Sequence, residues 1–253
     1  MPSERPVSGE PMPGEPVSGV PVSGERVAGV AVREAATVVL LRDGADGLET
    51  WLMRRVPRMA FAPGMSVFPG GGVDPVDATG PRSADEAAVA AQLGVTAEHA
   101  AVLLRTAARE IAEETDVRLP LEAIRPWARW ITPPAETRRY DAYFFVAVLP
   151  DRTLASHISG EASVAGWLPV AQALAEYREG TRPMLPPTVR TLMELSGHPT
   201  AAEVLAAAGS RTIRPITPVL RQQPAGDWVA DLGDGTVLPL PAGFITATGR
   251  RLP

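Results

Sequence analysis

The sequence predicts an α/β sandwich, in which a mixed β-sheet lies between layers of helices. Runs of β-branched and aromatic residues typical of strands stand before and after a long alanine-rich stretch typical of a helix. The chain has 253 residues, of which 45% are hydrophobic and 21% charged, and such a chain can bury most of its apolar surface on folding. We therefore expect one enlarged globular domain with extensions at its ends.

The first 30 residues are expected to be a disordered leader. They repeat imperfect units such as PVSGEP and PVSGERVAGV, which are rich in proline, glycine and serine and carry no aromatic residue. Such a segment buries too little apolar surface to offset the entropy lost on ordering. The core domain is expected over residues 31–210, and residues 211–253 are expected to form a C-terminal extension.

The core domain is expected to open with a β-hairpin. Its strands are Ala35–Leu41 and Glu49–Arg55, and the turn-forming residues Arg42-Asp43-Gly44 end the first of them. A stretch rich in proline and glycine follows. The alanine-rich segments 84–93 and 96–115 are then expected to be helices.

The second half of the chain is expected to continue with further strands and helices. The predicted strands are Trp127–Thr132, Tyr140–Leu149 and Val164–Leu168, and the predicted helices are Val170–Arg178, Thr188–Leu195 and Ala201–Ala208. In the C-terminal extension we expect a hairpin of Trp228–Leu232 with Thr236–Leu240 around Gly233-Asp234-Gly235. It would cover either the core or a neighbouring subunit, which leaves a homodimer open.

The composition excludes several classes of chemistry. The chain has no cysteine, which rules out disulfides, thiolate metal sites and cysteine nucleophiles. All its basic residues are arginine, so Schiff-base and Walker-type lysines are excluded as well. A net charge of −5 gives no general attraction to nucleic acid. Because no apolar run is long enough to cross a bilayer and no secretory pattern is present, we expect a cytoplasmic protein without a membrane partner.

An acidic cluster on the long predicted helix is the strongest indication of function. Glu110, Glu113 and Glu114 are spaced so that they share one helix face, where their like charges repel one another. A divalent cation would relieve this repulsion, and a site made only of oxygen ligands suits a hard ion such as Mg²⁺ or Mn²⁺. The alternative is a solvated acidic face with Arg109 as its counter-ion.

The segment around this cluster resembles the core of the Nudix box, Arg-Glu-(aliphatic)-x-Glu-Glu-x-Gly-(aliphatic). The matching residues are Arg109, Glu110, Ile111, Glu113, Glu114 and Val117. Asp116 replaces the glycine of the family, and aspartate tolerates the left-handed conformation that a helix end requires better than most residues. At the standard spacing, Ala101 stands where the box has its first glutamate. The resemblance extends over about residues 35–175 and implies a Nudix-type α/β/α sandwich with a mixed β-sheet.

Phe68-Pro69-Gly70-Gly71 resembles the FPGG turn of the same family, so a helical segment at about residues 74–95 is expected as an insertion before the acidic helix. Boxes stretched in this way resemble a subgroup that includes the peroxisomal coenzyme A diphosphatases. Leu52, Arg55 and Gly64 match the spacing of that subgroup's upstream signature, whereas Met53, Val56 and Ala60 depart from it. Arg58 would have to supply the charge that is missing at Ala60.

The resemblance implies a role for each of these residues. The implied metal ligands, for Mg²⁺ or Mn²⁺, are Glu110, Glu113 and Glu114. The implied catalytic residues are Glu110, which would alternatively take a proton from the attacking water, and Arg109, which would hold a carboxylate in place. The implied substrate-binding residues are Arg55, Arg58, Gly70 and Gly71. Glu136 or Glu161 would be distant replacements for the missing first glutamate.

The implied activity is metal-dependent hydrolysis of a diphosphate linkage in a small nucleoside diphosphate derivative. Coenzyme A or an acyl derivative of it is the first expectation for the substrate, with ADP-ribose or NADH as alternatives. Two other classes stay open, namely a Nudix-like regulator that binds a nucleotide without hydrolysing it and a purely structural α/β interaction module.

Overall fold

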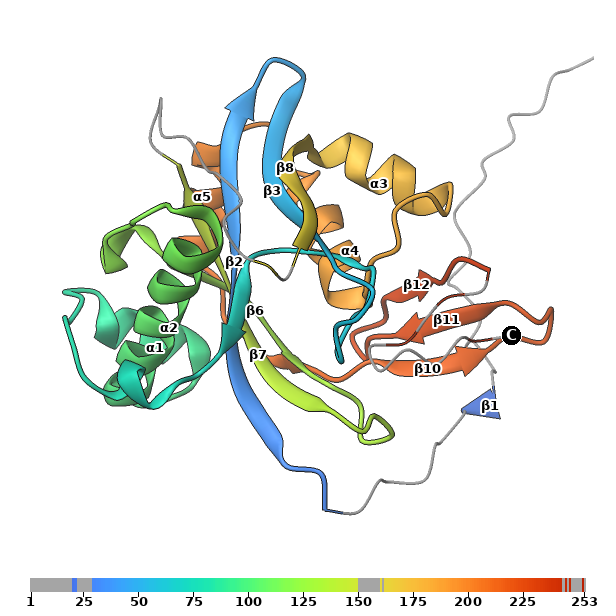
Figure 1. Cartoon of the computed structure of the whole chain (residues 1–253), viewed down its shortest axis with the longest axis horizontal. Helices are drawn as coiled ribbons and strands as arrows, with labels where there is room; N and C mark the ends of the chain where they lie inside the picture. The colour runs from blue at the N-terminus through green and yellow to red at the C-terminus, as the bar shows by residue number, and fades with distance from the viewer. Residues whose placement is uncertain are drawn as a thin grey trace, which may run out of the picture.

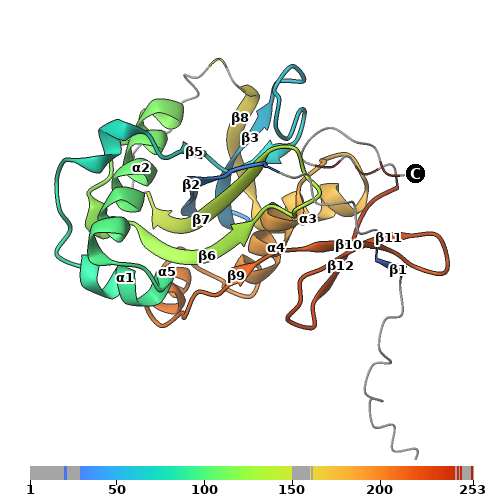
Figure 2. The ribbon, with the colours of Figure 1, turned by 90° about the horizontal axis from the view of Figure 1, so that it is seen from below.

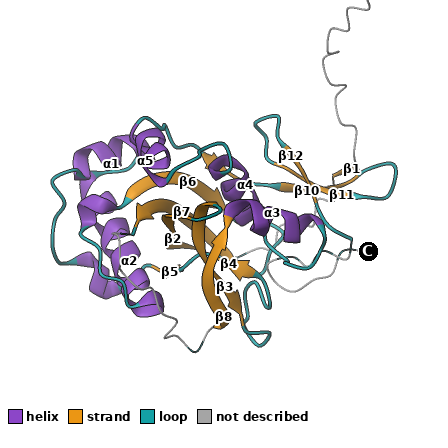
Figure 3. Ribbon diagram, turned by 90° about the horizontal axis from the view of Figure 1, so that it is seen from above, coloured by secondary structure: helices purple, strands orange, loops and turns teal. Residues whose placement is uncertain are grey.

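The computed structural model describes residues 20–21, 29–149, 160, 162–242, 244, 246 and 252. Most of the expected leader therefore lies outside the described residues. The described part is an α/β sandwich with a smaller second sheet beside it, as Figures 1 and 3 show. The fold class expected from the sequence is confirmed.

The main sheet has eight strands and is mixed. Its strands are β2 (Val32–Gly44), β3 (Gly47–Arg55), β4 (Ser66–Val67), β5 (Gly70–Gly72), β6 (Arg125–Ile131), β7 (Arg139–Val148), β8 (Ala162–Pro169) and β9 (Pro215–Ile216). Their order is β4-β3-β2-β7-β6-β9, with β5 paired to β2 and β8 paired to β3. The pairs β2–β7 and β6–β9 are parallel, and the remaining pairs are antiparallel.

The first hairpin is longer than the sequence suggested. The expected turn at Arg42-Asp43-Gly44 is wrong, because these residues continue β2 and the strand register reaches Gly44 opposite Gly47. Arg42 lies opposite Glu49, and its Nε donates to Glu49 Oε2 at 2.6 Å. This cross-strand ion pair favours the extended pairing. The turn itself is made by Ala45 and Asp46, and Gly47, whose φ of 106° suits glycine, begins β3 directly after it.

Helices cover both faces of the main sheet, as the end view in Figure 2 makes clear. They are α1 (Glu86–Leu93), α2 (Ala97–Thr115), α3 (Val170–Arg178), α4 (Pro186–Leu195) and α5 (Ala201–Gly209), with short 3₁₀ turns at Pro75–Ala78 (η1) and Leu121–Ala123 (η2). No single described helix is long and apolar enough to cross a bilayer, and α1 with α2 meet the length and composition only as a pair bent by 98°.

The central strands are buried on both faces and separate two hydrophobic cores. Alternate residues of β2 point to opposite faces, so Val38 and Leu40 pack with α1 and α2 while Val39 and Leu41 pack with α3, α4 and α5. This double burial explains why β2 and β7 appear in the sequence as nearly continuous apolar runs.

The smaller sheet is built mainly from the C-terminal extension. Its strands are β1 (Val20–Pro21), β10 (Val219–Gln222), β11 (Trp228–Asp231) and β12 (Val237–Pro239), in the order β1-β10-β11-β12 and all antiparallel. β11 and β12 form a hairpin where the sequence indicated one. The strand β1, which pairs with β10, lies within the segment that was expected to be disordered.

Candidate functional site

α2 carries the acidic cluster, and local sequence determines where this helix begins and ends. The side chain of Thr96 caps its N-terminus by accepting a hydrogen bond from the N–H of His99 at 3.2 Å. Asp116 ends the helix with φ 57° and ψ 15°, the left-handed conformation predicted from the sequence. One face of α2, which includes Leu103, Ala107 and Ile111, is buried against the sheet. The last turns of the helix then lie beside the glycine strand β5.

The three glutamates of α2 differ in exposure and in contacts. Glu114 is buried, and one of its carboxylate oxygens accepts a hydrogen bond from the N–H of Gly70 at 2.8 Å. The side chain of Glu110 is 12% exposed, whereas that of Glu113 is 58% exposed. The cluster therefore runs from a buried carboxylate that holds the glycine strand to a carboxylate in water.

Glycine is required at the positions in β5 that face this cluster. A Cβ atom on Gly71 would overlap the carboxylate of Glu110 and come within 2.6 Å of its Cδ. A Cβ atom on Gly70 would overlap the backbone oxygen of Ala36 in the neighbouring strand. At Gly70 the neighbouring atoms are backbone of β2, which cannot move aside, whereas at Gly71 a side chain would push the Glu110 carboxylate out of the position in which Arg109 holds it. Glycine at both positions therefore allows the close approach seen here.

Arg109 connects the glutamates to a buried aspartate. Its Nε and Nη2 atoms donate to the two carboxylate oxygens of Asp77 at 3.0 and 2.9 Å, and Nη2 also donates to the backbone oxygen of Gly72. On its other side, Nη1 donates to Glu110 at 2.7 Å and to Glu113 at 3.2 Å. The two-point pairing with Asp77 fixes the plane of the guanidinium and so fixes the direction of the bond to Glu110.

The environment shifts the pKa values of these two carboxyl groups in opposite directions. Burial raises the pKa of Glu110 above its usual value even though Arg109 donates to it. Burial also acts to raise the pKa of Asp77, but hydrogen bonds from Arg109, the N–H of Asp74 and Thr106 outweigh it and hold the value below its usual range. Asp77 is thus kept ionised as an ion-pair partner, while Glu110 is made the stronger base.

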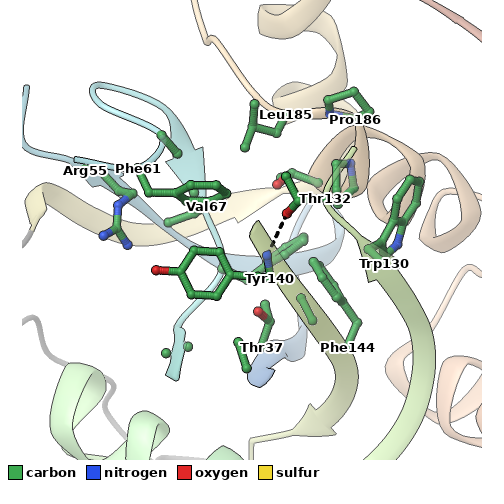
Figure 4. A pocket seen from close by; sticks show the side chains of 18 of the residues that line it. Thr37, Arg55, Phe61, Val67, Trp130, Thr132, Tyr140, Phe144, Leu185 and Pro186 are labelled. Atoms are coloured by element: carbon green, nitrogen blue, oxygen red, sulfur yellow. Dashed lines mark hydrogen bonds between the residues drawn. The ribbon is translucent and has the colours of Figure 1, made fainter. Parts of the chain in front are cut away.

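The glutamates form part of the wall of a pocket of about 570 Å³. β2, β5 and β7 contribute Thr37, Gly71 and Phe144 to its lining. β7 also contributes Tyr140, and the loop after β6 contributes Thr132. Figure 4 shows these aromatic and threonine side chains around the pocket, with the N–H of Tyr140 donating to Thr132 Oγ1 at 3.0 Å. A pocket of this size, lined by both apolar and polar side chains, is typical of a site for a small organic molecule.

The structure brings most of the predicted site residues together here. The predicted residues that line the pocket are Arg55, Gly70, Gly71, Glu110, Glu113 and Glu114. Arg109 lies directly behind Glu110, whereas Arg58 is exposed and is not among the lining residues. Glu136 is buried and lines the pocket, and Glu161 lies outside the described residues.

Whether the cluster fits a divalent cation can be judged from its donor atoms and their partners. All three glutamates offer carboxylate oxygens to the pocket, which is the donor type that Mg²⁺ and Mn²⁺ prefer. In their present rotamers, no group of three or more acidic or histidine side chains among the described residues is arranged to hold a metal ion. Arg109 bonds to Glu110 and Glu113 instead. The cluster thus fits a cation in donor type and location, and two of its carboxylates, Glu110 and Glu113, are hydrogen-bonded to Arg109.

Asp77 is the residue of the site that the sequence reasoning missed. It lies in η1, inside the segment interpreted only as an insertion. Asp74 caps this turn and forms a capping box with Asp77, in which each side chain accepts from the backbone of the other residue. The pattern Asp-x-x-Asp after the glycines was therefore an available sign of a helical turn. The partnership with Arg109, 32 positions further along the chain, had no local sign.

Comparisons with known proteins bear on the family and the fold. The model of the NUDIX domain matches residues 31–187. A NUDIX hydrolase from Alicyclobacillus acidocaldarius has 26% sequence identity, with 74% of this chain and 100% of that chain covered and a TM-score of 0.59. The NUDIX domain of Shewanella oneidensis NrtR complexed with ADP ribose has 17% identity, coverages of 70% and 94%, and a TM-score of 0.46. An Ap4A hydrolase from C. elegans has 18% identity, coverages of 70% and 99%, and a TM-score of 0.45. No curated protein sequence matches the chain.

Proposed function

The chain belongs to the NUDIX domain family and is a Nudix hydrolase, and we propose that it cleaves the diphosphate linkage of a coenzyme A-type substrate with Mg²⁺ or Mn²⁺. The observation that carries this proposal is the meeting of Glu110, Glu113 and Glu114 with the backbone of Gly70 and Gly71 in the wall of one pocket. Carboxylates for a cation and a glycine strand that a phosphate can approach closely are the parts that diphosphate hydrolysis needs.

The residues divide the work of this reaction. Hydrolases of the family generally use divalent metal ions. Glu113 and Glu114, with or without Glu110, would hold such an ion here, and a bound ion would lower the pKa of its water and neutralise phosphoryl charge. In the alternative role of Glu110, its carboxylate takes one proton from the attacking water. The water oxygen then bonds to phosphorus, the bridging P–O bond breaks, and its electron pair leaves with the departing phosphate ester. Arg109 holds Glu110 in position through Nη1.

The preference for coenzyme A rests on the residues upstream of the glycine strand. Leu52, Arg55 and Gly64 have the spacing found in the coenzyme A diphosphatase subgroup, and Arg55 lines the pocket, where a guanidinium suits phosphate oxygens. ADP-ribose and NADH stay as alternative substrates because the acidic cluster engages only the diphosphate that all of them share.

A non-catalytic nucleotide-binding role is the second candidate function. It is favoured by Ala101, which is fully buried where the family's box has a glutamate, and by the pairing of two glutamates with Arg109. Such a protein would bind a nucleotide in the same pocket without turnover.

The test is hydrolysis of coenzyme A, acetyl-coenzyme A, ADP-ribose, NADH and diadenosine polyphosphates with Mg²⁺ or Mn²⁺, with products identified by mass. The matched variants are Glu113→Gln, in the exposed part of the cluster, and Glu98→Gln, an exposed glutamate in the first turn of the same helix. We expect 3′,5′-ADP from coenzyme A with the wild type and the Glu98 variant, and loss of turnover in the Glu113 variant.

Each other outcome of this test has a definite meaning. Cleavage of another substrate alone would retain the reaction and replace the substrate. Equal activity in the Glu113 variant would remove the acidic cluster from the mechanism. Nucleotide binding without turnover with either metal would establish the regulatory role instead.

A further inference from the structure

One wall of the pocket comes from outside the part of the chain that the family model matches. That match ends at residue 187, whereas Pro218, Leu220 and Phe244 also line the pocket. Leu220 lies in β10, and Phe244 follows β12. The C-terminal extension therefore contributes side chains to the same site as the acidic helix.

The C-terminal wall is held firmly against the core domain. The hydroxyl of Tyr177 in α3 donates to the backbone oxygen of Pro239 at 3.0 Å, and Nη1 of Arg190 in α4 donates to Thr236 Oγ1 at 2.6 Å. Leu238, Leu240 and Phe244 belong to one buried cluster with Met184 and Leu192. Because it is joined by both packing and hydrogen bonds, this wall has a defined position from which it can contact a ligand.

One part of the pocket lining is apolar. The charged lining consists, among the described residues, of the α2 glutamates, Glu136 and Arg55. The part that we call the apolar compartment is lined by residues that pack with one hydrophobic cluster or lie next to it in the chain, namely Trp130, Phe144, Leu185, Pro186, Leu220 and Phe244. In Figure 4, Trp130, Leu185 and Pro186 lie across the pocket from Arg55. A substrate anchored by its diphosphate at the acidic helix would thus extend its remaining part toward an apolar surface.

We propose that the apolar compartment binds the acyl chain of an acyl-coenzyme A and that Leu220 and Phe244 make the enzyme prefer longer acyl chains. This inference rests on the proposed diphosphate hydrolysis at the α2 glutamates. Burial of alkyl groups against these side chains is favourable in proportion to the area removed from water. The free thiol of coenzyme A has no such group to bury, so the acyl derivative gains affinity that coenzyme A itself lacks.

The chemistry of the compartment also disfavours the alternative substrates. The terminal ribose of ADP-ribose carries several hydroxyl groups, each of which loses hydrogen bonds to water when it is buried. Among the six residues that line the compartment, the indole N–H of Trp130 is the only polar side-chain group. A polar sugar would therefore be held less well in this compartment than a hydrocarbon chain.

The experiment compares coenzyme A with its acetyl, butanoyl and octanoyl thioesters. For the wild-type chain we expect KM to fall with chain length, by at most about fourfold for each fully buried methylene, while kcat changes little. Leu220→Ala should reduce this dependence on chain length. Val219→Ala is the matched control, because Val219 is the exposed neighbour of Leu220 in β10 and does not line the pocket.

A second readout, calorimetric binding of octanoyl-coenzyme A and coenzyme A without metal, does not depend on turnover. Tighter binding of the octanoyl thioester, with a more negative heat-capacity change that Leu220→Ala diminishes, would support the proposal. Equal KM and equal affinity across the wild-type series would overturn it without any variant. An equal loss of the chain-length dependence in Leu220→Ala and Val219→Ala would overturn it as well. Absence of turnover with every diphosphate would instead count against the proposed function, while the binding series would still decide what the compartment holds.

Discussion

Replacement of Asp77 by asparagine would test whether this residue is the structural anchor of Arg109. Asp77 is 3% exposed, and its carboxylate accepts two hydrogen bonds from Arg109, one from Thr106 and one from the N–H of Asp74. Asparagine has almost the same shape, but it removes the charge and turns an amide donor toward groups that are themselves donors. The substitution therefore isolates the charge of the anchor from its size.

The expected loss of stability follows from these contacts. Hydrogen bonds to a charged group contribute about 1.5–3 kcal/mol each, and removal of one partner of a buried ion pair costs about 3–5 kcal/mol. The side chain of Arg109 is 22% exposed, so water recovers part of the loss. We expect Asp77→Asn to lower the free energy of unfolding by about 3 kcal/mol at neutral pH, and kcat to fall as Arg109 is released.

Urea unfolding of the wild type and the variant as a function of pH provides the assay. The pKa of Asp77 lies below its usual value of 3.8 in the folded protein, so its contribution is complete above that pH and is lost as the pH falls toward the folded pKa. The difference in free energy of unfolding between the wild type and Asp77→Asn should therefore shrink as the pH falls below 3.8. Asp46→Asn, at an exposed loop position, is the control and should change stability by less than about 0.5 kcal/mol. A difference under about 1 kcal/mol, or one that is constant with pH, would refute the anchoring role.

Three further predictions concern the site. Gly71→Ala places a methyl group against the carboxylate of Glu110 and should lower kcat by at least about tenfold. Gly72→Ala, whose Cβ has its nearest neighbour at 3.8 Å, should leave kcat unchanged. Equal kcat values in the two variants would contradict the close approach of Gly71 to Glu110. Ala101→Glu, which restores the glutamate of the family's box, should lower the free energy of unfolding in urea by about 3 kcal/mol or more, because Ala101 is fully buried; an unchanged free energy of unfolding would disprove this. A chelator should abolish turnover, and Mg²⁺ should raise the Tm of the wild type but not of Glu113→Gln; an equal shift in both would place the ion elsewhere.

Local pattern was enough to predict most elements of the fold. Helix α3 has the predicted bounds, and α2 begins one residue after its cap at Thr96, because capping residues and apolar spacing act within a few positions. The strands β5, β9 and β10 were not predicted, since they are short and exist only through pairing with distant partners. The overlong β2 was missed for a related reason, because its last residues are held by the ion pair to Glu49 in the next strand.

The candidate site was predicted where its residues are close in the sequence. The acidic face of α2 and the glycines of β5 each belong to a short recognisable motif, so Glu110, Glu113, Glu114, Gly70 and Gly71 could be predicted as site residues, and all five line the pocket. Asp77 and Leu220 could not, because each reaches the site only through the tertiary fold. Of the two arginines predicted to bind substrate, Arg55 lines the pocket, whereas Arg58, which was chosen to replace a missing charge, is exposed and does not line it.

The attachment of the C-terminal sheet also has a consequence for how the protein is made. The chain leaves the ribosome from its N-terminus, so the acidic helix emerges well before β9, β10 and the residues after β12. Until those strands emerge, β6 has an unpaired edge and the pocket lacks Leu220 and Phe244. A nascent chain thus contains its acidic helix before it contains the side chains that we propose select the ligand. The proposed selectivity can form only after β10 and Phe244 have been synthesised, later than the acidic helix.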